Sequence, residues 1–202
     1  FSNLLVDGDM AFKKEEVKEF LSLINLNCEQ LLALISDILD LSKIESNTMV
    51  FNITEQPLTP LLQNILRAQQ INVPQEVELL LALPSPDTII TTDPLRLKQV
   101  INNLINNAIK FTSKGAITLG YRQNNDQVSI FVKDTGTGID EDKINRIFER
   151  FYKGDNFVQG TGLGLAISHT IVEHLKGTIT VTSEIGKGSH FTIQHPIKRM
   201  GY

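Results

Sequence analysis

The sequence is poor in cysteine, in long apolar runs and in excess positive charge. Its single cysteine, Cys28, excludes an intramolecular disulfide and fits a reducing compartment. No apolar run approaches the roughly 20 residues that a membrane-spanning helix needs. With 19 lysines and arginines against 23 aspartates and glutamates, the net charge of -4 provides no diffuse positive field for nucleic acid or an anionic membrane surface. We therefore expect a cytoplasmic chain that binds neither.

Hydrophobic residues make up 41% of the 202 positions, enough to bury a core and to disfavour disorder. The chain starts without a methionine or a signal sequence, and its first residues resemble the interior of a helix. We expect a piece of a longer protein, attached to a membrane only through segments of that parent outside this sequence.

A long amphipathic helix is predicted from Val17 to about Ser46. Its apolar residues recur at alternating steps of four and three, which places them on one seam: Val17, Leu21, Ile24, Cys28, Leu31, Ile35 and Ile38. The apolar segment Phe1 to Val6 and the breaker Asp7 to Asp9 predict the end of an antiparallel neighbour and a turn. One short hairpin cannot fill its own core, so we expect residues 1–46 to form a dimeric four-helix bundle in a homodimer.

Residues 47–202 have the pattern of a separate α+β domain. Strands and helices follow one another without strict alternation, which favours an α/β sandwich, a mixed sheet covered by helices on one face. Strands are predicted at 49–53, 77–83, 88–91, 116–122, 128–133, 177–182 and 189–195, and helices at 59–69, 94–111 and 163–175. Asp93 as N-cap and Pro94 at the first position begin the 94–111 helix.

A polar stripe is predicted on the helix at 94–111. Asn103 and Asn107 lie one turn apart, and Lys110 follows on the same face. A carboxamide oxygen is a hard ligand that suits Mg²⁺, and a lysine can neutralise phosphate charge. Taken alone, the segment also fits a polar face exposed to solvent.

A glycine-containing loop is predicted where the strand at 128–133 ends. Asp134 ends the strand, and Gly136 and Gly138 follow it. A carboxylate can accept a hydrogen bond from an exocyclic amine such as that of adenine, and glycines let the backbone approach a ring closely. An ordinary Asp-Gly turn is the alternative interpretation.

Alternating glycines, Gly160, Gly162 and Gly164, lead into the helix predicted at 163–175. The first amides of a helix form an anion site that suits phosphates. A dinucleotide fingerprint has a different glycine spacing, and the Gly-Lys-Ser/Thr of a Walker loop is absent from this segment. A flexible hinge is the alternative interpretation.

An aromatic and basic stretch, residues 147–153, separates the two glycine segments. Phe148 can press inward, and Arg150 or Lys153 can reach a terminal phosphate. The polar residues 154–156 follow, so the stretch has the make-up of a mobile lid.

In this order and spacing, the four segments resemble the N box, first glycine box, F box and second glycine box of the histidine kinase catalytic domain. The helix at 17–46 resembles the second helix of that family's dimerisation and phosphotransfer hairpin. The similarity covers nearly the whole chain. It implies a Bergerat-type ATP sandwich for residues 47–202, shared with gyrase, mismatch-repair and heat-shock chaperone ATPases, and a partial hairpin for residues 1–46.

The resemblance implies ATP and Mg²⁺ as cofactors. It makes Asn107 the Mg²⁺ ligand, Lys110 a phosphate contact and Asp134 the acceptor for the adenine amine. The nucleotide site that it implies consists of Asn107, Lys110, Phe111, Asp134, Gly136, Gly138, Ile139, Phe148, Arg150, Lys153, Thr161, Gly162, Leu163 and Gly164. Asn103 completes a catalytic set with Asn107 and Lys110. At the position of Asn103, related ATPases that hydrolyse ATP have a glutamate as general base, so an amide there favours transfer to a protein acceptor.

The family's phosphoacceptor histidine lies on the first hairpin helix, ahead of this sequence, and no histidine precedes His169. His169 and His174 point in different directions on a helix, and His190 and His195 face opposite sides of a strand. We expect the chain to bind Mg·ATP and to dimerise weakly without autophosphorylation. The resemblance implies that in the parent the γ-phosphoryl would pass to the upstream histidine and then to an aspartate of a response regulator receiver domain.

Three rival functions share parts of this pattern. A regulatory module that binds nucleotide without chemistry would have the same boxes, although all of them look intact. A chaperone-like or gyrase-like ATPase would need the missing glutamate. A serine kinase of the anti-sigma type shares the nucleotide boxes but usually lacks the hairpin.

Overall fold

The structure, a computed structural model, describes residues 14–84, 87–153 and 161–198. The chain divides into two compact units, residues 1–49 and 50–202, which are described separately. No helix within these described residues combines the length and the apolar character needed to cross a membrane.

Helix α2 (Lys14–Glu45) is the described element of the first unit. Asn47 follows it in a left-handed conformation, with φ 53°, and the Thr48 N–H donates to the Lys43 carbonyl over 2.9 Å. This arrangement is typical of a helix C-terminus. The helix therefore ends close to the predicted Ser46.

Several residues of the predicted seam are exposed on α2. Leu21, Leu31, Ile35 and Ile38 have exposed fractions between 46% and 56%. Exposed apolar residues at heptad spacing indicate a face that pairs with another helix. The predicted partner segment, Phe1 to Val6 with the turn Asp7 to Asp9, lies outside the described residues, so the hairpin and the dimeric bundle stay predictions.

The second unit is built on a five-stranded mixed sheet in the order β2-β4-β5-β7-β6. The strands are β2 (Val77–Ala82), β4 (Gly115–Asn124), β5 (Gln127–Asp134), β6 (Thr178–Glu184) and β7 (Gly188–Pro196). β2 runs parallel to β4, and the other neighbours are antiparallel. Each of these strands begins and ends within two residues of its predicted bounds.

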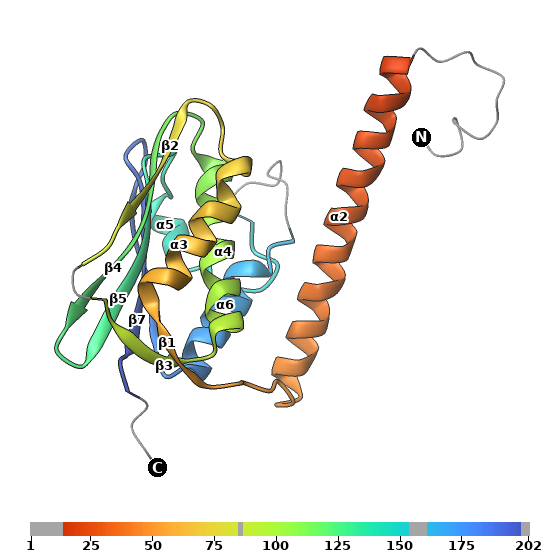
Figure 1. The fold of residues 1–202 in the computed structure, drawn as a ribbon. Helices are drawn as coiled ribbons and strands as arrows, with labels where there is room; N and C mark the ends of the chain where they lie inside the picture. The colour runs from red at the N-terminus through yellow and green to blue at the C-terminus, as the bar shows by residue number, and fades with distance from the viewer. Residues whose placement is uncertain (1–13, 85–86, 154–160, 199–202) are drawn as a thin grey trace. The chain divides into compact units, whose positions relative to one another are not determined.

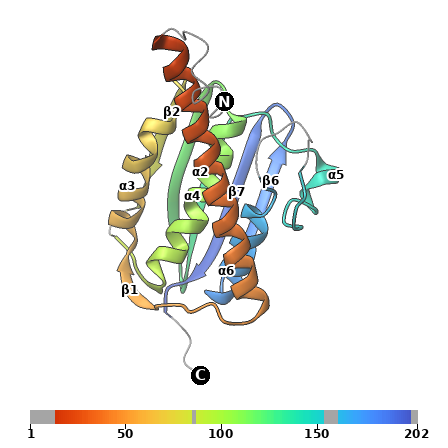
Figure 2. The same ribbon diagram turned by 90° about the vertical axis from the view of Figure 1, so that its right-hand side faces the viewer.

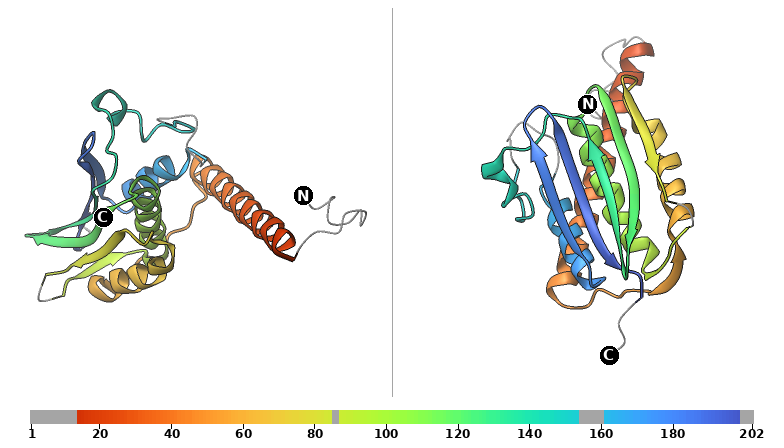
Figure 3. Two further views of the ribbon diagram at one scale, coloured as in Figure 1. Left: turned by 90° about the horizontal axis from the view of Figure 1, so that it is seen from above. Right: turned by 90° about the vertical axis from the view of Figure 1, so that its left-hand side faces the viewer.

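Three helices cover one face of this sheet: α3 (Leu58–Gln69), α4 (Pro94–Phe111) and α6 (Gly164–His174). Figure 1 shows them on the same side of the sheet, and Figure 2 shows them next to one another in front of it. The right-hand view of Figure 3 shows the opposite face, with the strands in front. The predicted α+β sandwich is confirmed. A short helix, α5 (Glu141–Ile144), was not predicted.

The strand predicted at 49–53 is wrong. Strand β1 (Thr54–Pro57) starts after it and pairs antiparallel with β3 (Ile89–Thr92) in a separate two-stranded sheet. Residues 51 and 52 make other contacts in place of strand pairing. The Phe51 ring stacks on the His174 ring with their centres 5.2 Å apart, and the Asn52 N–H donates to Asp93 Oδ2 over 2.8 Å.

Helix α4 begins where the sequence predicts because Asp93 caps it. Asp93 Oδ1 accepts hydrogen bonds from the N–H groups of Leu95 and Arg96, and Pro94 occupies the first turn. The face of α4 that packs in the core is apolar and consists of Leu97, Val100, Ile101, Leu104, Ile105 and Ala108. The same helix therefore carries core residues on one side and the polar stripe on another.

His195 lies fully buried where β7 meets the two-stranded sheet. Its Nδ1 is 2.6 Å from the Pro196 carbonyl and its Nε2 is 3.1 Å from Thr92 Oγ1. Because a carbonyl only accepts, Nδ1 carries a proton; in the neutral imidazole Nε2 then accepts from the threonine hydroxyl. Burial lowers the pKa of His195 below its ordinary value, with the hydrogen bond to the Pro196 carbonyl opposing the effect, and the lowered pKa favours the neutral imidazole.

We expect the free energy of unfolding to fall as the pH drops below about 6.5, the ordinary histidine pKa, because the unfolded chain then gains a proton that His195 resists in the fold. Denaturant unfolding at pH 7.5 and 5.5 measures this dependence. The free energy of unfolding of His195→Gln, which lacks the titrating group, should fall less steeply over the same pH interval. Equal slopes in the two proteins would contradict the assignment.

Candidate functional site

Asn103 joins α4 to α6. Its Nδ2 donates to Ser168 Oγ over 2.9 Å, and Ser168 is buried on α6. At the start of α6, Gly164 comes so close that a Cβ there would lie 2.3 Å from Asn103 Oδ1. The amide therefore fixes the first turn of α6 against α4, which is a positioning role. Gly164 is needed for this close approach.

Asn107 and Lys110 continue the polar stripe toward the end of α4. Asn107 is half-buried and Lys110 is exposed, with its Nζ 5.4 Å from the centre of the Phe111 ring. The pKa of Lys110 is lowered by partial burial and then by the nearby charge of Lys153. The two ammonium groups repel each other, and an anion bound between them would offset this repulsion. Lys153 of the predicted lid is thus brought to the stripe on α4.

Asp134 ends β5 with its side chain 5% exposed. Its Oδ1 accepts from the Gly136 N–H over 2.9 Å and from the Ser189 N–H over 3.1 Å. Burial raises the pKa of this carboxyl, and the two backbone hydrogen bonds partly offset the effect. No hydrogen bond to Oδ2 is found within the described part of the chain, so this oxygen is available to a ligand.

The loop after Asp134 is held on both sides. A Cβ on Gly136 would lie 2.3 Å from the Phe111 carbonyl oxygen, and the Thr137 N–H donates to that carbonyl over 3.1 Å. On the other side, the Ile139 N–H donates to Ser183 Oγ over 2.8 Å. The loop that carries Gly136 and Gly138 is therefore fixed between the end of α4 and the β6–β7 hairpin.

Sequence reasoning missed the contribution of this hairpin. Ser183 Oγ holds the loop at Ile139 and lies 3.0 Å from Ser189 Oγ, while the backbone of Ser189 holds Asp134. The only signal in the sequence is Gly188, whose φ of 97° and close approach to the Asp134 carbonyl leave no room for a side chain. Such contacts depend on the pairing of β5 with β7, which a local pattern does not reveal.

The aromatic stretch and the second glycine segment meet in the structure. The Phe151 N–H donates to the Gly162 carbonyl over 2.9 Å. Phe148 is half-buried, with its ring 5.4 Å from that of His169 on α6. Arg150 lies exposed in the same stretch. The predicted lid residues 154–156 and the predicted Gly160 lie outside the described residues.

The start of α6 offers backbone amides. Thr161 Oγ1 accepts from the N–H of Leu163 over 3.2 Å, and the Leu163 side chain is fully buried. No side chain caps α6 at its N-terminus within the described residues. The first N–H groups of this 11-residue helix lie on the side of α6 that faces Asn103, and N–H groups at a helix start favour an anion.

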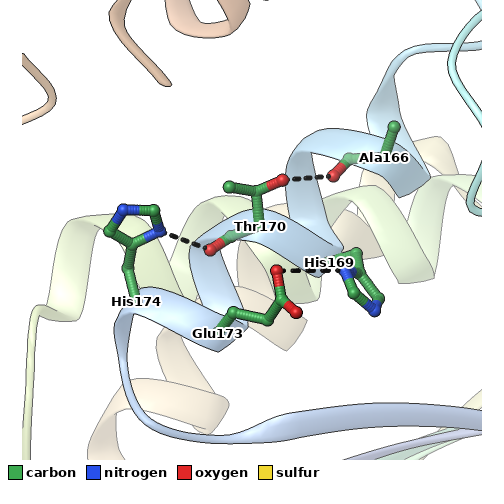
Figure 4. Close-up of polar contacts among 5 residues, drawn as sticks. All are labelled: Ala166, His169, Thr170, Glu173 and His174. Atoms are coloured by element: carbon green, nitrogen blue, oxygen red, sulfur yellow. Dashed lines mark hydrogen bonds and ion pairs between the residues drawn. The ribbon is translucent and has the colours of Figure 1, made fainter. Parts of the chain in front are cut away.

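Figure 4 shows the two histidines of α6 engaged within their own helix. His169 Nδ1 is 3.4 Å from Glu173 Oε2, and His174 Nδ1 is 2.9 Å from the Thr170 carbonyl. As predicted from their spacing, the two rings point in different directions. Within the described residues, no group of three or more histidine, cysteine, aspartate and glutamate side chains could hold a metal ion.

Residues 92–199 match the family described as histidine kinase-, DNA gyrase B-, and HSP90-like ATPase. This match covers more than half of the chain, and the chain therefore belongs to that family. The chain is similar to sensor histidine kinases, and the resemblance to a histidine kinase catalytic ATP-binding domain is confirmed.

The sensor histidine kinase RcsC of Escherichia coli strain K12 is 40% identical over 189 residues, covering 90% of this chain and 20% of RcsC. The aerobic respiration control sensor protein ArcB of the same strain is 34% identical over 203 residues, covering 95% of this chain and 25% of ArcB. The crystal structure of full-length ShkA in complex with AMPPNP has a TM-score of 0.80 at 27% identity, covering 96% of this chain and 41% of ShkA. The chain thus spans 20% to 25% of the length of these curated relatives.

Proposed function

We propose that this chain binds Mg·ATP between α4, the loop after β5 and the start of α6. The parent protein would transfer the γ-phosphoryl to a histidine on its dimerisation hairpin, and then to an aspartate of a response regulator receiver domain. The observation that carries the proposal is Asp134: a buried carboxylate with one oxygen held by backbone N–H groups and the other available.

At the base end, Asp134 Oδ2 would accept a hydrogen bond from the adenine amine. A buried carboxylate costs free energy unless it has partners, and a ligand amine would supply the one that the fold leaves out. The loop carrying Gly136, Gly138 and Ile139 would form one wall of the base pocket, and Phe111, 40% exposed beside it, would contact the base.

At the phosphate end, positive groups would meet from separate elements. Lys110 comes from α4, Lys153 and Arg150 follow α5, and the backbone amides of residues 161–164 lead into α6. Ammonium groups and helix N-termini both favour phosphate. This arrangement would place the triphosphate over the end of α4.

Asn107 fits a magnesium ion that arrives with the nucleotide. Its half-buried amide has no hydrogen bond within the described residues and lies one turn before Lys110. Magnesium keeps most of its water and takes few protein oxygens, so one amide beside a phosphate site suffices. The bound ion would neutralise charge on the phosphate oxygens. Mg²⁺ alone should bind weakly, because no acidic cluster is present in the described part of the chain.

Transfer to a protein acceptor is favoured over hydrolysis. The residue at the position where hydrolytic relatives have a glutamate is Asn103, and its amide is already bonded to Ser168. An amide is a poor general base, and this one is occupied in holding α6. The exposed seam of α2 supports a homodimer through the hairpin, where the acceptor histidine of the family would lie.

Titration of the purified chain with ADP, with and without Mg²⁺, tests the proposal. We expect saturable binding, weakened about fivefold to thirtyfold in Lys110→Met because a charge-assisted phosphate contact is lost. Lys187→Met, which removes an equal charge paired with Glu184 on the β6–β7 hairpin, is the matched control and should bind ADP like the wild type. A folded wild type that binds no ADP at millimolar concentration would overturn the proposal and favour an interaction module.

A further inference from the structure

Thr112 carries a buried hydroxyl that is left without a hydrogen bond by the described part of the chain. The residue follows the last residue of α4 and is 1% exposed. Within the described residues, its Oγ1 has no hydrogen-bond partner. Buried hydroxyls in folded proteins nearly always have a hydrogen-bond partner, so this group calls for one beyond the described residues, such as a bound ligand or water.

This hydroxyl lies beside the backbone that holds the base-binding carboxylate. A Cβ on Gly136 would lie 2.8 Å from Thr112 Oγ1. The Gly136 N–H donates to Asp134 Oδ1 over 2.9 Å. Thr112 and Asp134 therefore approach the same glycine of the loop, one from the end of α4 and the other from the end of β5.

We propose that Thr112 is a further nucleotide-positioning residue, whose hydroxyl hydrogen-bonds the bound purine base or a water on the edge of that base. A hydroxyl both donates and accepts, so it can serve either a ring nitrogen or a water. The inference rests on the proposed function, because it assumes that the base lies against Asp134 and Gly136. It assigns to Thr112 a role that its position after a helix, which resembles an ordinary C-cap, does not reveal in the sequence.

Thr112→Val tests the role, because valine keeps the shape of threonine and removes only the hydroxyl. ADP carries both base and phosphates, whereas adenosine carries the base alone. We expect Thr112→Val to weaken the binding of ADP and the binding of adenosine by the same factor, about fivefold to thirtyfold. Thr112→Ser keeps the hydroxyl and should stay within about threefold of the wild type. Calorimetry for ADP and NMR titration for adenosine give the two affinities.

Lys110→Met provides the opposite pattern, a loss for ADP with adenosine unchanged. An unaltered ADP affinity in Thr112→Val would overturn the inference, and so would a loss confined to ADP. The thermal midpoint of the free Thr112→Val protein should not fall. A large fall would show that the hydroxyl has a partner within the free protein, which also contradicts the inference. If the wild type binds neither ligand, the proposed function itself fails. If the wild type binds both and Thr112→Val binds them equally well, only the role of Thr112 fails.

Discussion

Gly138→Ala is expected to destabilise the domain by about 2–5 kcal/mol and to abolish measurable ADP binding. Gly138 has a φ of 73°, a left-handed conformation that costs an alanine about 1–2 kcal/mol. In addition, a Cβ there would lie 2.1 Å from the Glu184 carbonyl oxygen, which belongs to the backbone of β6 and cannot move aside cheaply. Relief requires the loop to separate from the β6–β7 hairpin.

Gly186→Ala is the matched control. Gly186 has nearly the same φ, 77°, but a Cβ there would meet no atom within 4 Å. Its substitution should cost only the conformational part, about 1–2 kcal/mol, and leave ADP binding intact. Urea unfolding measures the two free energies, and calorimetry measures ADP binding. Equal losses in the two variants would show that close packing at Gly138 does not hold the loop.

Local chemistry in the sequence was enough to predict most elements of the domain. Helix α4 was predicted with its observed bounds because Asp93 and Pro94 define its start and its apolar residues recur with the helical period. The strands were predicted from runs of apolar and β-branched residues. Where local pattern failed, at 49–53, the backbone and rings found distant partners, such as Asp93 for Asn52, 41 residues away.

The sequence predicts the polar side chains of the site but not the residues that hold them in position. Glycine spacing and charge identify Asp134, Gly136 and Lys110 because those residues have unusual local requirements. Ser183 and Ser189 support them across 44 and 55 residues, through contacts that exist only once β5, β6 and β7 have paired. Ser183 acts through its hydroxyl and Ser189 through its backbone N–H, which every residue except proline has, so the sequence carries no local mark of either role.

Asp134→Asn is expected to weaken ADP binding about tenfold to a hundredfold, the loss of a hydrogen bond to a charged acceptor. The asparagine Oδ1 can still accept from the N–H groups of Gly136 and Ser189, so the loop keeps its shape. The group presented to the ligand changes from an accepting oxygen to a donating amide, which faces the donating amine of adenine. Hypoxanthine has an accepting oxygen at that position, so the preference for ADP over IDP should nearly vanish in the variant.

Asp126→Asn is the matched control, because it removes the same charge from the β4–β5 turn. It should leave both nucleotide affinities unchanged. Calorimetric titration of ADP and IDP into the three proteins measures the ratio directly. An Asp134→Asn protein that still prefers ADP as strongly as the wild type would remove Asp134 from base recognition.

The same substitution is expected to stabilise the free protein at pH 7. Burial raises the pKa of Asp134 in the folded state above its unfolded value, so the ionised carboxylate lowers the free energy of unfolding once the pH exceeds the folded pKa. This cost disappears as the pH falls from the folded pKa to the unfolded value of about 3.8, because the folded carboxyl then takes up a proton first. Asp134→Asn should therefore unfold at higher urea concentration than the wild type at pH 7, with a difference that closes toward pH 4. If Asp134→Asn is less stable than the wild type at pH 7, the carboxylate stabilises the fold. If the variant is more stable but binds ADP more weakly, the carboxylate lowers the stability of the free protein and contributes to ligand binding.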